Sequence, residues 1–308
     1  MTAITTLTLN PTVDHSAKID DVVPDRKLRC HDERYDPGGG GINVATAITQ
    51  LGGEALALFT CGGAIGQLLR ELLDQRSVRY DTILTDGHTR ENVIIFESGG
   101  NQQFRFGMPG PRLDEEEQER CIQAVLRLDP APQYLVLSGS LPPGVPADFY
   151  GRIIDRLGSS TRVILDVSGE ALAKGVEQSV YLLKPNQREL EDLSGKVIRS
   201  DSDVRAAAHS MIDRGKVEVV MVSLGRGGVM LVTRDEEYRI SAPSVKMRSK
   251  IGAGDSTVAG TVLALHRGMP LKDAARFGVA CGSACVMTEG TELCHREDAD
   301  RLFAEMDR

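Results

Sequence analysis

The sequence has few aromatic residues, no long apolar segment and no leader-like start, and each absence excludes a class of protein. Its 308 residues include no tryptophan and only 4% aromatic residues, so we expect a globular protein with a core of small aliphatic side chains. No apolar segment is long enough to span a bilayer, and Met1–Thr6 has neither the basic start nor the apolar run of a leader. We therefore expect a cytoplasmic protein without a membrane partner.

An excess of positive charge is also missing. Against 36 basic residues stand 44 acidic ones, which gives a net charge of −8. Such a balance disfavours nucleic acid and anionic lipid as partners. If the substrates are phosphates, the basic groups that meet them must be few and local.

Standard metal and nucleotide motifs are absent as well. The six cysteines contain no C-x-x-C pair, and the spacing of Cys281, Cys285 and Cys294-His295 matches no standard zinc pattern. Because cysteine is also a common small core residue, we predict reduced, buried thiols. There is no G-x-x-x-x-G-K-[ST] loop and no G-x-G-x-x-G after a strand, so a nucleotide site must be built differently.

What the chain does have is an alternation of apolar strands and amphipathic helices. This alternation of strands and helices predicts an α/β fold with a mainly parallel sheet covered by helices on both faces. Two insertions, 12–36 and 88–108, instead contain strands with alternating polar residues and no helices to cover them. We expect 1–11, 37–87 and 109–308 to form the core, and the insertions to form a small β-sheet that acts as a lid, a dimer contact or both.

The elements expected in the core follow from hydrophobic periodicity. Expected strands are 4–9, 54–59, 78–84, 134–137, 163–167, 180–183 and 217–222, with an antiparallel pair at 228–233 and 237–241. Expected helices are 42–51, 64–75, 115–126, 147–157, 186–193, 204–214, 271–288 and 297–306, and another that starts at Gly254.

The stretch Gly252-Ala253-Gly254-Asp255 is the clearest candidate for chemistry. Its glycines allow a tight turn, and the apolar run behind it predicts a helix, so free N–H groups would face a phosphate at the helix start. A carboxylate in such an anion site suits a general base that takes a proton from an alcohol while a phosphoryl group arrives. Taken alone, the four residues fit better an ordinary helix start that Asp255 caps.

Together with Gly38-Gly39-Gly40-Gly41-Ile42-Asn43, this stretch resembles the two signatures of the PfkB, or ribokinase-like, family of sugar kinases. The likeness runs from about residue 4 to residue 305. Within the family, the segments Lys27–Arg29, Ser138–Gly144 and Lys184–Glu189 resemble the minor type of 6-phosphofructokinase. The resemblance implies a ribokinase-like fold, ATP with Mg²⁺, and transfer of phosphate to C1 of fructose 6-phosphate in glycolysis, with Asp255 as base.

The phosphate donor would lie near two further segments. The family's N-x-x-E motif implies that Asn186 meets the phosphates and that Glu189 holds Mg²⁺ through water. Lys184, two residues before Asn186, could also meet the phosphates. Without the resemblance, the segment reads as a helix start with Pro185 near N1. The turn after strand 217–222 would let backbone approach the nucleotide, or would simply close a hairpin. Its candidate residues are Ser223, Gly225, Gly227 and Gly228.

The acceptor sugar would lie near polar residues that follow strand ends. Asp14 and Asn43 are the residue types that bind hydroxyls, although they also suit a turn and a helix cap; the resemblance favours hydroxyl contact. Ser138 is a weaker candidate for this pocket. The glycines that would let a sugar approach backbone N–H groups are Gly38, Gly39, Gly40 and Gly41.

A phosphate on the acceptor would need basic residues, and four lie in the insertions. We favour Arg90, which resembles a phosphate contact of the minor 6-phosphofructokinases, then Lys27 and Arg29, and last Arg105. For any one of them, the alternative is a solvated charge on an exposed strand. Relatives that use fructose 1-phosphate or tagatose 6-phosphate typically carry lysine where this chain has Gly40.

The resemblance also implies a K⁺ site. The wider family often has aspartate three residues before the first glycine of G-A-G-D, where this chain has Ser249. The expected site comprises Ser249, Ile251, Cys285, Thr288 and Gly290.

Other functions stay open on the sequence alone. The same fold could serve as a tagatose-6-phosphate kinase or a 1-phosphofructokinase; the basic insertion residues disfavour a free sugar or a nucleoside. A sugar-phosphate-binding regulator without catalysis is a different class, against which the joint presence of Gly252, Gly254, Asp255 and Glu189 argues. The exposed second sheet predicts a homodimer.

Overall fold

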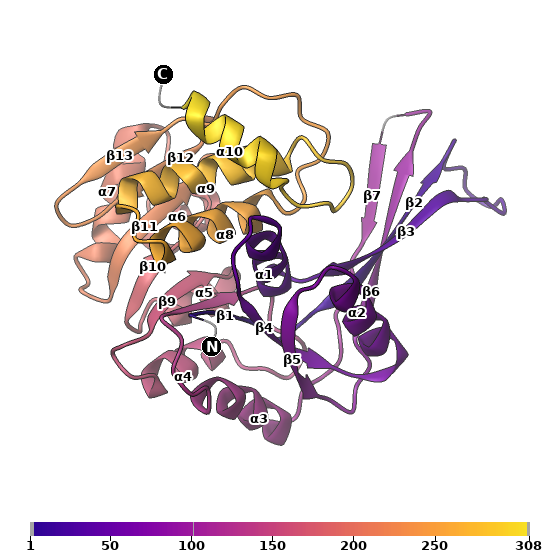
Figure 1. Cartoon of the computed structure of the whole chain (residues 1–308), viewed down its shortest axis with the longest axis horizontal. Coiled ribbons are helices and arrows are strands. Elements are labelled where there is room, and N and C mark those ends of the chain that lie inside the picture. Colours follow the sequence, from indigo (N-terminus) through magenta and orange to yellow (C-terminus); the bar gives the residue numbers. More distant parts are fainter. Residues whose placement is uncertain (1–2, 101, 307–308) are drawn as a thin grey trace.

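The computed structural model describes residues 3–100 and 102–306 and contains two sheets. The larger has nine strands in the order β13-β12-β11-β10-β9-β8-β1-β4-β5. All its neighbours pair in parallel except β11 with β12 and β12 with β13, which are antiparallel; the antiparallel pairing of β12 with β13 was expected. Figure 1 shows this sheet in the body of the molecule, with helices on both sides and the small sheet projecting from one edge.

The strands of the large sheet are short and mostly apolar, and several are buried along their whole length. They are β1 (Ile4–Thr8), β4 (Leu56–Cys61), β5 (Arg79–Leu84), β8 (Tyr134–Ser138), β9 (Arg162–Asp166), β10 (Val180–Leu183), β11 (Val217–Ser223), β12 (Val229–Val232) and β13 (Glu237–Ile240). Strands buried on both faces read as continuous apolar runs, which is why the sequence located them well.

Helices cover the two faces of this sheet and give two apolar cores. One core includes residues of α1, α2, α8, α9 and α10, and the other residues of α3, α4, α5, α6 and α7. The helices are α1 (Gly40–Gln50), α2 (Gly63–Gln75), α3 (Glu115–Leu126), α4 (Phe149–Arg156), α5 (Gly169–Gly175), α6 (Gln187–Ser194), α7 (Asp201–Ile212), α8 (Ala253–His266), α9 (Leu271–Cys285) and α10 (Arg296–Glu305). The expected α/β architecture is thus confirmed.

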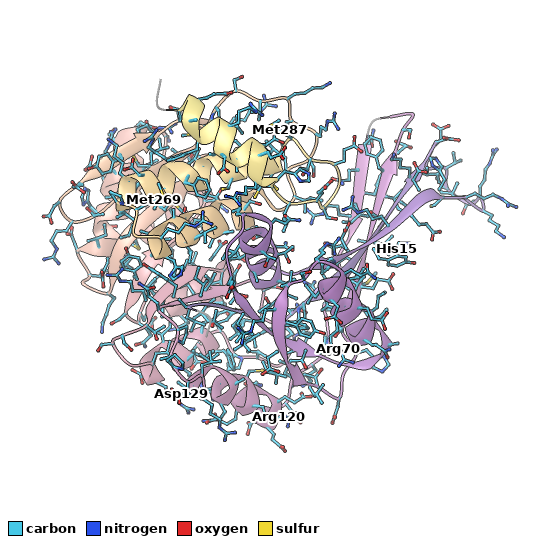
Figure 2. All side chains as sticks on the ribbon, viewed as in Figure 1. His15, Arg70, Arg120, Asp129, Met269 and Met287 are labelled. Atoms are coloured by element: carbon cyan, nitrogen blue, oxygen red, sulfur yellow. The ribbon has the colours of Figure 1, made fainter. Side chains whose placement is uncertain are left out.

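The small sheet has the order β3-β2-β6-β7, with β2 (Thr12–Ile19), β3 (His31–Gly38), β6 (Arg90–Glu97) and β7 (Gln102–Phe106). β2 runs parallel to β6 and antiparallel to β3. On this sheet His15, labelled in Figure 2, stacks on Tyr35 with ring centroids 4.2 Å apart. The expectation that no helix covers these strands was wrong in part, because α2 packs against β2, β3 and β6.

Two further points separate the structure from the sequence-based expectation. Helix α5 was missed, because its seven residues are too few to show a clear period. Cys30 is exposed, so the prediction of buried thiols is wrong for it; the other five cysteines are buried and all six are free. Within residues 3–100 and 102–306, no helix has the length and apolar character needed to cross a membrane.

Candidate active site

Helix α8 begins where the sequence predicted an anion site. Its N-cap, Gly252, has φ of 76°, a left-handed conformation that favours glycine. A Cβ at Gly252 would also lie 2.5 Å from a methyl carbon of Leu293, so the position has no room for a side chain. The turn therefore aims the free N–H groups of the first turn, which contains Gly254 and Asp255, at the space before the helix.

Asp255 is partly buried and does not act as a helix cap. Its Oδ2 accepts a hydrogen bond from Nδ2 of Asn43 at 2.7 Å, which joins the starts of α1 and α8. Burial and the charge of Asp166 raise the pKa of Asp255 to about 6, against the effects of Asn43 and Lys184. A carboxyl group with this pKa is largely ionised at neutral pH and can still take up a proton, as a general base must.

A buried lysine lies beside this carboxylate. Lys184, 8% exposed, follows β10, and its Nζ lies 2.9 Å from Oδ1 of Asp166, the last residue of β9. Burial opposes the charge of Lys184, but attraction to Asp166, Asp255 and Glu189 keeps its pKa above the usual value. A Cβ at Gly254 would lie 3.6 Å from Nζ, so the ammonium group faces the start of α8. The site thus keeps a positive charge beside the predicted phosphate position.

Asn186 and Glu189 form a capping box at the start of α6. The backbone N–H of Glu189 donates to Oδ1 of Asn186 at 2.9 Å, and the backbone N–H of Asn186 donates to Oε2 of Glu189 at 2.8 Å. Asn186 is the N-cap, so the placement of Pro185 near N1 was wrong; Pro185 precedes the cap. Oε1 of Glu189 accepts no hydrogen bond from the part of the chain that the structure describes, and this oxygen fits a water bound to Mg²⁺.

The glycine turn after β11 lies next to Asn186. Ser223 forms a parallel bridge with Asn186, and its N–H donates to the carbonyl of Pro185 at 2.8 Å. The turn itself connects antiparallel strands, as the hairpin interpretation expected. Gly225 and Gly228 have φ of 58° and 89°, and Gly227 completes a short 3₁₀ turn between them. The predicted nucleotide residues therefore lie in one region.

The four-glycine loop lies at the topological switch point of the large sheet, where successive strands are added on opposite sides of β1. β1 lies between β8 and β4, and ligands of open α/β sheets bind at the carboxyl ends beside such a switch point. A Cβ at Gly40 would lie 2.2 Å from Oγ of Ser138, and one at Gly41 would lie 2.5 Å from Oγ1 of Thr8. The loop thus brings Gly40 into contact with Ser138, and neither glycine has room for a side chain.

Asp14 lies on the small sheet beside the last residue of β3. It is 8% exposed, and its Oδ1 accepts from Nδ2 of Asn92 at 2.9 Å. Burial raises the pKa of Asp14, whereas the hydrogen bond and the charges of Arg105 and Arg90 lower it. A Cβ at Gly38 would lie 2.8 Å from Oδ2 of Asp14, so these two predicted sugar contacts are adjacent.

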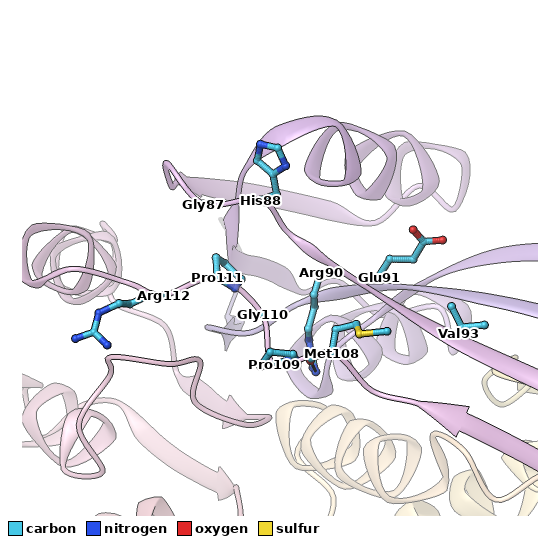
Figure 3. A pocket seen from close by; sticks show the side chains of 10 residues that line it. All are labelled: Gly87, His88, Arg90, Glu91, Val93, Met108, Pro109, Gly110, Pro111 and Arg112. Atoms are coloured by element: carbon cyan, nitrogen blue, oxygen red, sulfur yellow. Dashed lines mark hydrogen bonds between the residues drawn. The ribbon is translucent and has the colours of Figure 1, made fainter.

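Arg90 links the small sheet to the large one. One guanidinium nitrogen donates to the carbonyl of Met108 at 2.7 Å and another to that of Asn10 at 3.0 Å, while the buried Nε has no partner among the described residues. Burial lowers the pKa of Arg90, and Asp14 opposes this effect. Arg90 lines an open depression of about 740 Å³. Figure 3 shows its side chain running toward Met108 and Pro109, with Arg112 pointing away.

Lys27 and Arg29 are not brought to this site within one chain. Both are exposed in the loop between β2 and β3. Figure 1 places this loop at the end of the small sheet that is remote from the nine-stranded sheet. Arg105, on β7, is exposed but close enough to act on the charge of Asp14.

The residues expected to hold K⁺ do cluster. Oγ of Ser249 donates to the carbonyl of Gly290 at 2.6 Å, the thiol of Cys285 donates to the carbonyl of Ile251 at 3.3 Å, and Oγ1 of Thr288 donates to the carbonyl of Cys285 at 2.7 Å. Burial raises the pKa of the Cys285 thiol to about 12, so it is neutral. Carbonyl and hydroxyl oxygens are a donor set that suits K⁺.

Sequence analysis missed two polar residues of this region. Asp166 is the last residue of β9 and pairs in register with Ser138, the last of β8. The strand-end argument that selected Ser138 applies equally to Asp166 and could have found it. Asn92 offered no such signal, because it lies near the start of β6 and reaches Asp14 only through strand pairing.

Comparison with known proteins now decides the family, because a model of the pfkB family carbohydrate kinases matches residues 7–298. The chain belongs to the pfkB family of carbohydrate kinases. The ATP-dependent 6-phosphofructokinase isozyme 2 of Mycobacterium tuberculosis is 44% identical over 301 residues, which cover 97% of this chain and 88% of the relative.

Solved structures are also similar to this pfkB-family chain over its whole length. Phosphofructokinase-2 from Escherichia coli in complex with potassium superposes with a TM-score of 0.95 at 39% identity, and in complex with fructose-6-phosphate with 0.92 at 38%; each covers 100% of both chains. A ribokinase from Thermotoga maritima superposes with 0.78 at 22% identity over 99% of this chain and 100% of its own, which shows a ribokinase-like fold.

Proposed function

We propose that this chain transfers the terminal phosphoryl group of ATP to the C1 hydroxyl of fructose 6-phosphate, giving fructose 1,6-bisphosphate. The observation that carries the proposal is the carboxylate of Asp255 at the start of α8, held by Asn43 and flanked by Lys184. The similarity to enzymes named 6-phosphofructokinase supports the choice of acceptor.

In this mechanism Asp255 takes the proton of the C1 hydroxyl. The hydroxyl oxygen then bonds to the terminal phosphorus while the bond from that phosphorus to the bridging oxygen breaks, and ADP leaves. The N–H groups of Gly252, Ala253 and Gly254 and the ammonium of Lys184 stabilise the charge on the transferred group. Glu189 would hold, through water, the Mg²⁺ that accompanies ATP, and this ion would neutralise negative charge on the triphosphate.

The sugar would lie between the glycine loop and the small sheet. We assign its hydroxyls to Asp14, Asn43 and Ser138, because these side chains surround the loop. The nucleotide would lie along Asn186, Ser223 and the glycine turn, on the other side of Lys184. In this proposal the acceptor and the donor would lie on opposite sides of Asp255, as in-line transfer requires.

We further propose that the small sheet pairs with that of a second copy of the chain. Large apolar side chains are exposed on it and its loops: Val22, Val23, Leu28, Tyr35, Phe106 and Met108. Lys27 and Arg29 lie in the same exposed loop, so closure of the sheet as a lid or pairing with a partner could carry them to a sugar phosphate. A monomer in light scattering at micromolar concentration would argue against the dimer.

An ADP-release assay with a panel of sugar phosphates tests the proposed activity. We expect turnover with fructose 6-phosphate to exceed that with fructose 1-phosphate, tagatose 6-phosphate, free fructose and a nucleoside. Faster turnover with either of the other phosphates would reassign the substrate, and no ADP release with any of them, at full binding of fructose 6-phosphate, would favour a regulator.

A further inference from the structure

Asp36 is a buried carboxylate for which the proposed mechanism has no use. It lies on β3, is 2% exposed, and accepts hydrogen bonds from three segments. Nε of Arg34 donates to it at 2.9 Å, a guanidinium nitrogen of Arg76 donates to it from the end of α2, and Oγ1 of Thr291 donates at 2.5 Å from the loop before α10. Because a buried charge is costly unless it is paired, these contacts fix the three segments relative to one another.

On one side Asp36 adjoins the proposed sugar contacts. It pairs in register with Asp14 across β2 and β3 and lies two residues before Gly38. The charge of Asp36 also contributes to the raised pKa of Asp14, after burial as the main cause. A shift of Asp36 would therefore displace β2 and β3 where they face the sugar, and would change the electrostatic potential at Asp14.

On its other side, Asp36 holds the loop of the candidate K⁺ site through Thr291. The neighbouring carbonyl of Gly290 accepts from Ser249 at 2.6 Å, and the carbonyl of Glu292 accepts from Oγ1 of Thr288 at 2.5 Å. A cation bound at the carbonyl of Gly290 would fix the direction of that carbonyl and thereby the position of Thr291, the next residue. A second link from Arg34 to Glu292 spans 3.9 Å between exposed or half-exposed side chains and is correspondingly weak.

We propose that Asp36 and Thr291 are positioning residues that couple the K⁺ site to the sugar site, so that K⁺ tightens the binding of fructose 6-phosphate. This inference rests on the proposed function. Coupling between two binding sites is reciprocal, so the sugar phosphate must tighten the binding of K⁺ by the same factor.

Isothermal titration with fructose 6-phosphate in the absence of ATP tests the coupling without turnover. Affinity is measured in potassium chloride and in tetramethylammonium chloride at matched ionic strength. For the natural chain we expect affinity to be higher in K⁺ by about 5- to 150-fold, the usual range of such coupling. Thr291→Val should bring this ratio close to one, and Thr291→Ser, which keeps the hydroxyl, should retain it.

Thr233→Val is the matched control, because its hydroxyl also donates a hydrogen bond, but to the backbone carbonyl of Glu236 in the turn between β12 and β13. Its ratio should equal that of the natural chain. If Thr291→Val does not fold, Asp36→Asn makes the same test. An unchanged ratio in the folded variant, or a ratio of one in the natural chain, overturns the coupling and leaves the proposed function intact. Failure of the natural chain to bind fructose 6-phosphate in either salt refutes both.

Discussion

The strand ends of the nine-stranded sheet and the loop between β2 and β3 of the small sheet hold their charged side chains differently. At the strand ends of the large sheet, Lys184 is buried and paired with Asp166, and Asp255 is held by Asn43. On the small sheet, Lys27 and Arg29 are exposed in a loop. A side chain fixed by burial keeps the geometry that proton and phosphoryl transfer need, whereas an exposed one can adapt to a ligand or a partner. We therefore assign chemistry to the large sheet and recognition to the small one.

The largest expected effect comes from removing the base. Asp255→Asn should lower kcat by about 10²–10⁴, the usual contribution of a general base, and leave the fold intact. Steady-state kinetics measures kcat, and circular dichroism shows whether the fold is intact. Asp273→Asn is the control, because Asp273 also lies in the first turn of a helix, α9, away from the proposed site. Near-normal turnover of Asp255→Asn would refute its role.

The same variant has an expected effect on stability. The pKa of Asp255 rises from 3.8 to about 6 on folding, so the folded state binds the proton more tightly than the unfolded state. By linkage, the natural chain loses stability as the pH rises from about 4 through 6. Asp255→Asn removes this loss, so at pH 7.5 the variant should be more stable by about 1–3 kcal/mol in urea unfolding. Equal stability at that pH would show that the carboxylate is better solvated than its burial indicates.

Two substitutions by alanine, one in each sheet, compare how tightly the two sheets are packed. Ile164 is fully buried in β9, so Ile164→Ala should lower the free energy of unfolding by about 2–5 kcal/mol. Phe106 on β7 is 52% exposed, so Phe106→Ala should change it by at most about 0.5 kcal/mol in the monomer. Urea unfolding at low protein concentration measures both. A comparable loss in the two variants would contradict the division into a packed core and an exposed small sheet.

A smaller effect is expected where the two sheets meet. Arg90→Ala should raise KM for fructose 6-phosphate about 10-fold or more, since hydrogen bonds to charged groups contribute about 1.5–3 kcal/mol, and should leave KM for ATP nearly unchanged. Arg112→Ala is the control, because it lines the same depression but points away in Figure 3. Equal changes in both KM values, or a lowered melting temperature alone, would make Arg90 a purely structural link through Asn10 and Met108.

The smallest expected effect is a shift in the pH profile. For the natural chain, kcat/KM should fall about tenfold per pH unit below about pH 6, as Asp255 becomes protonated. Asn43→Ala removes a hydrogen bond that lowers this pKa, so the acid limb should move to higher pH. Asp166→Asn removes a charge that raises the pKa, so the limb should move to lower pH. Each shift should be under about one pH unit, because a single hydrogen bond contributes about 1 kcal/mol. An unmoved limb in both variants would assign it to another group.

Much of this architecture was predictable because local patterns carry it. Buried strands such as β10 and strongly amphipathic helices such as α3 were located at their observed bounds. The start of α8 at Gly252–Asp255 was predictable because its glycines and apolar run are contiguous in the chain. The interpretation of Asn186 and Glu189 was incomplete, since the same i, i+3 spacing that suits Mg²⁺ also forms a capping box.

The sequence alone determined the class of fold and the position of Asp255, because hydrophobic periodicity and a local glycine turn need only neighbouring residues. Only the tertiary structure decided the partners of that carboxylate. Asn43, which donates a hydrogen bond to it, lies 212 positions away in the chain. Lys184 is held near it by an ion pair with Asp166, at the end of another strand. The pKa of Asp255 therefore could not be read from the chain, since it depends on burial and on charges that only the assembled sheet and helices bring together.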